Sequence, residues 1–188
     1  ADLVTLDLKM CQRAAGSHAG RDRLRALDAD VVAAEVEMCQ RAHDGHKARH
    51  NHGTLNADAL LAGGVRSVII ENFGDAPFFA SAVPPHVPAM MSVIGSHVRA
   101  RFDAMGINVL RNDGHAAIGV AAATQADFVR INVFTGAAWT DQGLIEGQAA
   151  ELTRYRASLD QRSVAIMDDV LVKHAVPAGT SCIETLAR

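Results

Sequence analysis

Val65-Arg66-Ser67-Val68-Ile69-Ile70 is a short, mostly apolar stretch that ends directly before two polar residues, Glu71 and Asn72. Three later stretches repeat this pattern of an apolar run followed by polar residues, over 105–110, 127–133 and 164–170. Longer segments with helical features lie between them. Short β-branched runs that alternate with helices are typical of repeated βα units and a parallel sheet. The sequence therefore predicts an α/β fold.

Helix signals fill the segments between the predicted strands. Apolar residues recur at helical spacing over 87–102, directly after Pro84-Pro85, and prolines suit the start of a helix. Asp113 is expected to cap an alanine-rich helix that runs to Thr124 and packs closely against the sheet. Two further helices are expected from apolar spacing, one over 24–38 and one over 144–159 with Thr140 and Asp141 as caps. A first strand is expected over 3–8.

The size, composition and charge of the chain limit the classes of partner that it can bind. With 188 residues, of which 49% are hydrophobic, it has the size of one domain and enough apolar side chains to form a core. Its net charge of -3 provides no basic footprint for nucleic acid or an anionic membrane. No apolar run approaches the roughly 20 residues that span a bilayer. Small-molecule or protein partners are therefore expected.

The cysteines and histidines predict neither a metal site nor a cofactor. Cys11, Cys39 and Cys182 are widely spaced and form no CxxC pair, which favours reduced thiols and a cytoplasmic location. A histidine cluster over 43–52 could share one helical face and bind metal, but its glycines favour a solvated loop. Phosphate-binding glycine loops and the serine-hydrolase elbow are missing from the sequence.

Polar residues gather where the predicted strands end. In parallel α/β proteins the ligand lies at the carboxyl ends of the strands, because the loops converge there. Three successive strands place polar residues two or four positions apart, on one face. Buried polar side chains are costly unless they are paired or bind a ligand, so we expect a site, with an internal network of salt bridges and amides as the alternative. The candidate ligand-binding residues are Glu71, Asn72, Asn108, Arg111, Asn112, Arg130, Asn132, Asp141 and His174.

Chemistry is expected from two of the strand-end residues. Asp169 and Lys173 could serve as general acid and base, and Lys173 could form a Schiff base. Alternatively, Lys173 neutralises Asp169 or binds an anion. Arg111 and Arg130 indicate a small anionic ligand, because a guanidinium matches phosphate or carboxylate oxygens.

The run Val68-Ile69-Ile70-Glu71-Asn72-Phe73-Gly74-Asp75-Ala76-Pro77-Phe78 resembles a signature of the BtpA/SgcQ family. Further motifs follow in the family's order over 106–113, 126–133, 140–147 and 169–175, so the resemblance covers residues 54–188, and residues 1–53 diverge from it. The resemblance implies a TIM-type barrel grouped with the ribulose-phosphate-binding barrels. Asp168 stands where the family usually has a small residue, which adds a carboxylate beside Asp169.

The family suggests two functions. One class is associated with the accumulation or stability of photosystem I proteins, and the SgcQ-like class is described as nucleosidases or sugar-metabolism proteins. The first hypothesis is therefore a barrel that binds an anionic sugar phosphate or nucleoside, and the alternative is a non-catalytic assembly or stability factor for a membrane complex.

Length also bears on the fold. A complete barrel needs about 250 residues, so residues 1–188 are expected to form a single incomplete domain with about five of eight βα units. Such a partial barrel would expose an apolar sheet edge that another segment, or a second copy in a homo-oligomer, would cover.

Overall fold

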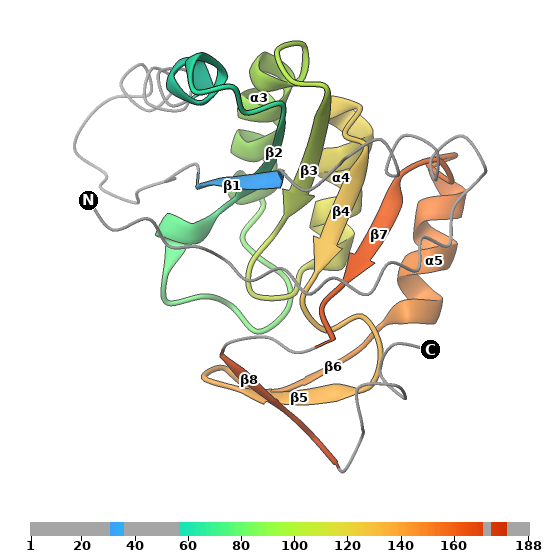
Figure 1. The fold of residues 1–188 in the computed structure, drawn as a ribbon. Helices are drawn as coiled ribbons and strands as arrows, with labels where there is room; N and C mark the ends of the chain where they lie inside the picture. Colours follow the sequence, from blue (N-terminus) through green and yellow to red (C-terminus); the bar gives the residue numbers. More distant parts are fainter. Residues whose placement is uncertain (1–30, 36–56, 171–173, 180–188) are drawn as a thin grey trace.

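The computed structural model describes residues 31–35 by their backbone, and residues 57–170 and 174–179 in full (Figure 1). Five strands form one parallel sheet in the order β1-β2-β3-β4-β7. They are β1 (Val31–Glu35), β2 (Ser67–Glu71), β3 (Ala104–Asn108), β4 (Phe128–Ile131) and β7 (Ala165–Asp168). The last four lie within or next to the four apolar runs of the sequence, so the prediction of an α/β fold with a parallel sheet is confirmed.

Helices cover one face of this sheet. They are α3 (His86–Arg99), α4 (Gly114–Thr124) and α5 (Ala149–Ser158), and residues 57–62 are also helical. Figure 1 shows α3 and α4 side by side behind the strands. Alternate strand residues, such as Ile70, Ile107 and Val129, pack with helix residues in the main core, while Ile69 and Phe128 belong to a second cluster. This alternation follows from the two-residue period of a strand.

The predicted starts of α3 and α4 agree with the structure. Asp113 is the N-cap of α4, where its carboxylate accepts a hydrogen bond from the Ala116 amide at 2.8 Å. The same side chain also accepts from the Val83 amide at 2.8 Å. α3 begins directly after Pro85, as expected from its fixed φ angle. Asp113 therefore ties the start of α4 to the segment that precedes α3.

A second, antiparallel sheet was not expected from the sequence. It has the order β6-β5-β8 and consists of β5 (Ala137–Thr140), β6 (Gly143–Glu146) and β8 (Ala175–Pro177). Figure 1 shows it below the ends of β4 and β7. The second sheet thus lies next to the edge where the parallel strands end.

Two helix predictions need correction: the helix predicted over 144–159 is present but begins only at Ala149, and residues 31–35, within the helix predicted over 24–38, form a strand. Residues 143–146 form a strand, because Gly143 adopts a φ of +101° and closes a tight turn after Thr140, whose hydroxyl donates to the Gly143 carbonyl at 2.9 Å. The following helix begins after Gln148, so Thr140 and Asp141 do not cap it. Residues 31–35 also form a strand, because their backbone pairs with β2 over five positions.

The described strands form no closed barrel: among them, β1 and β7 are the two edges of the parallel sheet. Its strands follow one another in chain order, as successive βα units do, and the TIM-type barrel stays a prediction. The strand expected over 3–8, the histidines of 43–52, all three cysteines and Lys173 lie outside the described residues. No helix in the described part of the chain is long and apolar enough to cross a membrane.

Candidate functional site

Glu71 and Asn108 begin the site at the carboxyl ends of β2 and β3. The two residues are opposite each other in the strand register, and both side chains are buried. Asn108 Nδ2 donates a hydrogen bond to Glu71 Oε1 at 2.9 Å. Parallel pairing thus places a buried carboxylate and an amide together, although 37 residues separate them in the sequence.

Arg130, on β4, connects Glu71 to Asp169, which follows β7. Its Nε and Nη2 atoms donate to the two oxygens of Asp169 at 3.1 and 2.9 Å, and its Nη1 atom donates to Glu71 Oε1 at 3.2 Å. Burial alone would lower the pKa of Arg130, but the hydrogen bonds and charges of Asp169 and Glu71 raise it above its ordinary value. We call Glu71, Asn108, Arg130 and Asp169 the strand-end network.

Asn132 extends this network toward a pocket. Its Nδ2 atom donates to Asp169 Oδ2 at 3.0 Å. The residue is only 6% exposed, and its Oδ1 atom has no hydrogen-bond partner among the described residues. A buried acceptor without a partner costs free energy, typically 1–3 kcal/mol. The hydrogen bonds among the described residues therefore leave the Asn132 side chain only partly satisfied.

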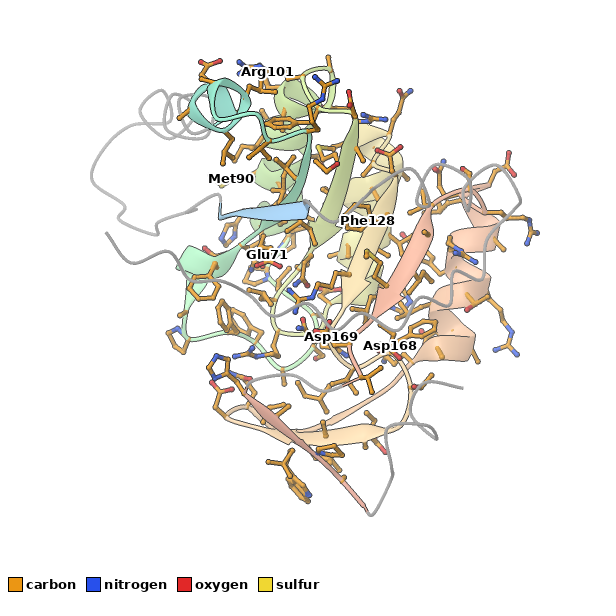
Figure 2. The ribbon with its side chains drawn as sticks, viewed as in Figure 1. Glu71, Met90, Arg101, Phe128, Asp168 and Asp169 are labelled. Carbon is orange, nitrogen blue, oxygen red and sulfur yellow. The ribbon has the colours of Figure 1, made fainter. Side chains whose placement is uncertain are left out.

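Asp168 lines this pocket from the end of β7. Figure 2 labels it together with Asp169 and Glu71. Its carboxylate accepts hydrogen bonds from the Phe134 amide at 3.1 Å and from the Thr135 hydroxyl at 3.2 Å. Burial raises the pKa of Asp168 to about 6, against the lowering effect of these two bonds, and the charge of Asp169 adds to the increase. Asp168 can therefore exchange a proton near neutral pH.

The pocket is small and polar on one side. Its volume is about 30 Å³, and it is bounded by the end of β4, the end of β7 and the inner face of the second sheet. Asn132, Thr135, Asp168 and Asp169 supply its polar lining, and Ala138 and Pro177 supply part of its apolar lining. A volume of this size accommodates one small functional group or a water molecule.

Asn72 and Asn112 have main-chain partners. Asn72 Oδ1 accepts from the Leu110 amide at 2.6 Å, and its Nδ2 donates to the Leu110 carbonyl at 3.3 Å. Asn112 makes the same pair of bonds with the Val133 amide and carbonyl, at 2.8 and 3.0 Å. These two predicted ligand-binding residues therefore connect the end of one strand to the end of the next.

Arg111 and Asp141 form a separate group. Arg111 Nη2 lies 3.3 Å from Asp141 Oδ1, and its Nε donates to Gln142 Oε1 at 3.2 Å. The guanidinium lies over the Phe78 ring, with 4.9 Å to the ring centroid. The Asp141 side chain is 61% exposed, whereas the Arg111 side chain is only 13% exposed, so the partners of Arg111 largely cover it.

Sequence reasoning located the strand-end network but omitted two pocket residues. Asp168 and Thr135 were not among the candidate site residues, although both follow or end a predicted strand and Asp168 departs from the family pattern. Asp168 and Asp169 have different hydrogen-bond partners, and their neighbouring positions in the sequence do not predict this difference. His174 is exposed in the structure, before β8. Lys173 is not among the described residues, so its catalytic role stays a prediction.

Comparison with known proteins gives the relationship of the chain. It is 52% identical over 128 residues to the photosystem I biogenesis protein BtpA of Synechocystis sp., covering 68% of this chain and 44% of that protein. It is 46% identical over 117 residues to an uncharacterized protein of Thermococcus kodakarensis, covering 62% and 44%. An uncharacterized mitochondrial protein of Caenorhabditis elegans is 33% identical over 124 residues, covering 63% and 45%.

The chain thus spans less than half the length of these relatives. No solved structure matches it. The sequence model of the BtpA family matches residues 50–188, which include every described residue of the strand-end network and its pocket. The chain belongs to the BtpA family.

Proposed function

We propose that this BtpA-family protein binds a small polar metabolite of the sugar or nucleoside type at the carboxyl ends of its parallel strands. The observation that carries the proposal is the buried Oδ1 atom of Asn132, which has no hydrogen-bond partner among the described residues and belongs to a residue that lines the pocket. A ligand that donates a hydrogen bond would remove this cost. Hydroxyl groups of a sugar or of a ribose supply such donors.

The anionic part of the ligand is better matched to Arg111 than to Arg130. Both guanidinium edges of Arg130 that face the network are already occupied by carboxylates, through three hydrogen bonds. Arg111 instead pairs with the exposed Asp141. A phosphate group would take the place of the Asp141 carboxylate, which is the exposed member of this pair.

A ligand screen on the full-length protein tests the proposal. Thermal unfolding is measured with sugars, sugar phosphates, nucleosides and nucleotides, first for the unmodified protein. We expect stabilisation by at least one class, and loss of that stabilisation in Asn132→Ala and Asp169→Asn. Arg66→Ala is the matched control, because Arg66 also pairs with a carboxylate, Asp103, but on the surface. Equal stabilisation of all variants would contradict binding at this site.

A second candidate function is assembly or stability of a photosystem I-type complex. It is favoured by the 52% identity to a protein named for photosystem I biogenesis. The outer face of the second sheet also carries three exposed apolar residues in register, Leu144, Trp139 and Val176. Binding to a subunit of such a complex would bury this row, which we call the apolar row.

The fluorescence of Trp139 separates the two candidates, because it is the single tryptophan of the chain. For this experiment Trp139 is replaced by 5-hydroxytryptophan, which is spectrally distinct, so that its emission can be distinguished from that of photosystem I. We expect its emission to shift to shorter wavelength on addition of the complex if the assembly function holds. An unchanged emission, with no co-sedimentation, would contradict that function.

A further inference from the structure

The pocket beside Asp168 presents hydrogen-bond acceptors. Asn132 Oδ1 accepts no bond within the described residues. The Asp168 carboxylate accepts bonds from Phe134 and Thr135, and a carboxylate has about four acceptor positions. The Thr135 hydroxyl proton and the Asn132 amide are directed at the carboxylates. The polar side chains of the pocket therefore favour a ligand group that donates several hydrogen bonds.

The charges around the pocket favour a cation. Two carboxylates, those of Glu71 and Asp169, pair with the single guanidinium of Arg130, and the third carboxylate, Asp168, lines the pocket beside Asp169. With Asp168 ionised, these three carboxylates carry one more negative charge than they do when Asp168 is protonated. Partly buried charge of one sign is unfavourable without a counter-charge. Among the described residues, no three histidine, cysteine, aspartate or glutamate side chains are placed so that they could hold a metal ion, which favours an organic cation.

We propose that the pocket binds a primary ammonium group of the ligand, held by Asn132 Oδ1 and the carboxylates of Asp168 and Asp169. An ammonium has three donors and no acceptor, and it therefore matches three acceptor side chains. The pocket volume of about 30 Å³ fits one group of this size. This inference rests on the proposed ligand site and restricts its ligand to amine-bearing molecules, such as an amino sugar.

The proposed binding depends on pH. Burial raises the pKa of Asp168 to about 6, so its carboxylate is largely protonated at pH 5 and largely ionised at pH 7. The charged groups near it are Asp169, which follows it in the chain, and Arg130 and Glu71 beyond Asp169. An ammonium ligand should bind more tightly at pH 7 than at pH 5, because ionisation of Asp168 adds a counter-charge.

Matched probes test the inference by calorimetric titration of the full-length protein. Glucosamine and glucose differ by an ammonium in place of a hydroxyl, and ethanolamine supplies the ammonium without a sugar. At pH 7 we expect glucosamine to bind about tenfold more tightly than glucose, the factor expected for one charge-assisted hydrogen bond. This preference should decrease at pH 5 and disappear in Asp168→Asn. Glu146→Gln, on the exposed β6 strand, is the control that should keep it.

The outcomes also separate this inference from the proposed function. Glucose that binds as tightly as glucosamine would overturn the ammonium site and leave the sugar site in place. Ethanolamine binding without any sugar binding would support the ammonium site and contradict the sugar proposal. Binding of none of the three probes would overturn the inference. If Asp168→Asn does not fold, the loss of preference between pH 7 and pH 5 in the unmodified protein decides the matter.

Discussion

Three buried asparagines follow the ends of consecutive parallel strands and use the same amide group differently. Asn72 and Asn112 each pair with the main-chain amide and carbonyl of a residue near the next strand end. Asn132 donates instead to the Asp169 carboxylate, and its buried oxygen has no partner among the described residues. The first two asparagines thus position the loops at the strand ends, and the third differs from them by its unsatisfied acceptor.

Replacing Arg130 with alanine should destabilise the protein strongly. The change leaves the carboxylates of Glu71 and Asp169, which are mostly buried, without their counter-charge. Breaking a buried ion pair in this way typically costs about 3–5 kcal/mol, and the partial exposure of Arg130 places our expectation at the lower end. Urea denaturation at pH 7 measures it. Arg66→Ala should cost less than about 1 kcal/mol, and equal losses in both variants would contradict a structural role for the network.

The protonation of Asp168 should make stability depend on pH. Its pKa is raised from 3.8 to about 6 in the folded protein, so the folded state holds a proton that the unfolded state releases. The stabilisation is complete below pH 3.8 and is lost as the pH rises through about 6. The free energy of unfolding of the unmodified protein, relative to that of Asp168→Asn, should therefore decrease between pH 4 and pH 6.5.

Chemical denaturation at several pH values measures this difference. The same comparison with Glu146→Gln, which changes an exposed carboxylate, should show no such decrease. A difference between the unmodified protein and Asp168→Asn that stays constant with pH would contradict the raised pKa.

Strands β3 and β4 fit together because Gly106 has no side chain. Gly106 lies opposite Phe128 in the strand register, and a Cβ atom at Gly106 would overlap the Phe128 ring. Both residues are buried, and Phe128 is only 1% exposed. The site depends on this pairing, because Asn108 and Arg130 lie two residues beyond the two contact positions.

Gly106→Ala should therefore destabilise the protein by about 1–3 kcal/mol, the usual cost of overpacking a core. Thermal or urea unfolding measures the loss. The second change Phe128→Leu should recover part of it in the double variant, because a smaller side chain makes room for the added methyl group. If the loss of stability in the double variant equalled the sum of the losses in the two single variants, steric overlap with Phe128 would not be the cause.

Local patterns predicted most of the described elements. Apolar runs predicted four of the five parallel strands. An aspartate directly before an alanine-rich segment predicted the Asp113 cap. β1 and β6 were expected to be helical, because the apolar spacing around them suits a helix. Pairing with β2, and the tight turn at Gly143, outweigh that spacing. The partner of β1 lies far along the chain and outside any short window of sequence, whereas the partner of β6 is the adjacent strand β5.

The second sheet gives the molecule a polar pocket on one side and an apolar surface on the other. Its inward residues Ala138 and Ile145 are buried, while Trp139, Leu144 and Val176 are exposed, in agreement with strand alternation. Figure 1 shows this sheet next to the carboxyl ends of β4 and β7. The pocket and the apolar row therefore belong to opposite faces of one small sheet.

Trp139 should report whether the apolar row is covered. Its side chain is 57% exposed, so the isolated protein should show the emission of a water-exposed indole and efficient quenching by acrylamide. Dilution over a wide concentration range is the control for self-association. A protected, short-wavelength emission that becomes exposed on dilution would show that a second copy covers the row, as the expectation of a homo-oligomer requires.

The sequence determined the α/β class, the family and the set of polar residues at the strand ends, because apolar runs, caps and motifs are properties of neighbouring residues. The tertiary structure decided which of those residues meet. Strand register brings Glu71, Arg130 and Asp169 together across long sequence separations. Burial then raises the pKa of Asp168, and it leaves the Asn132 oxygen without a partner among the described residues, since both effects depend on what surrounds a side chain in space.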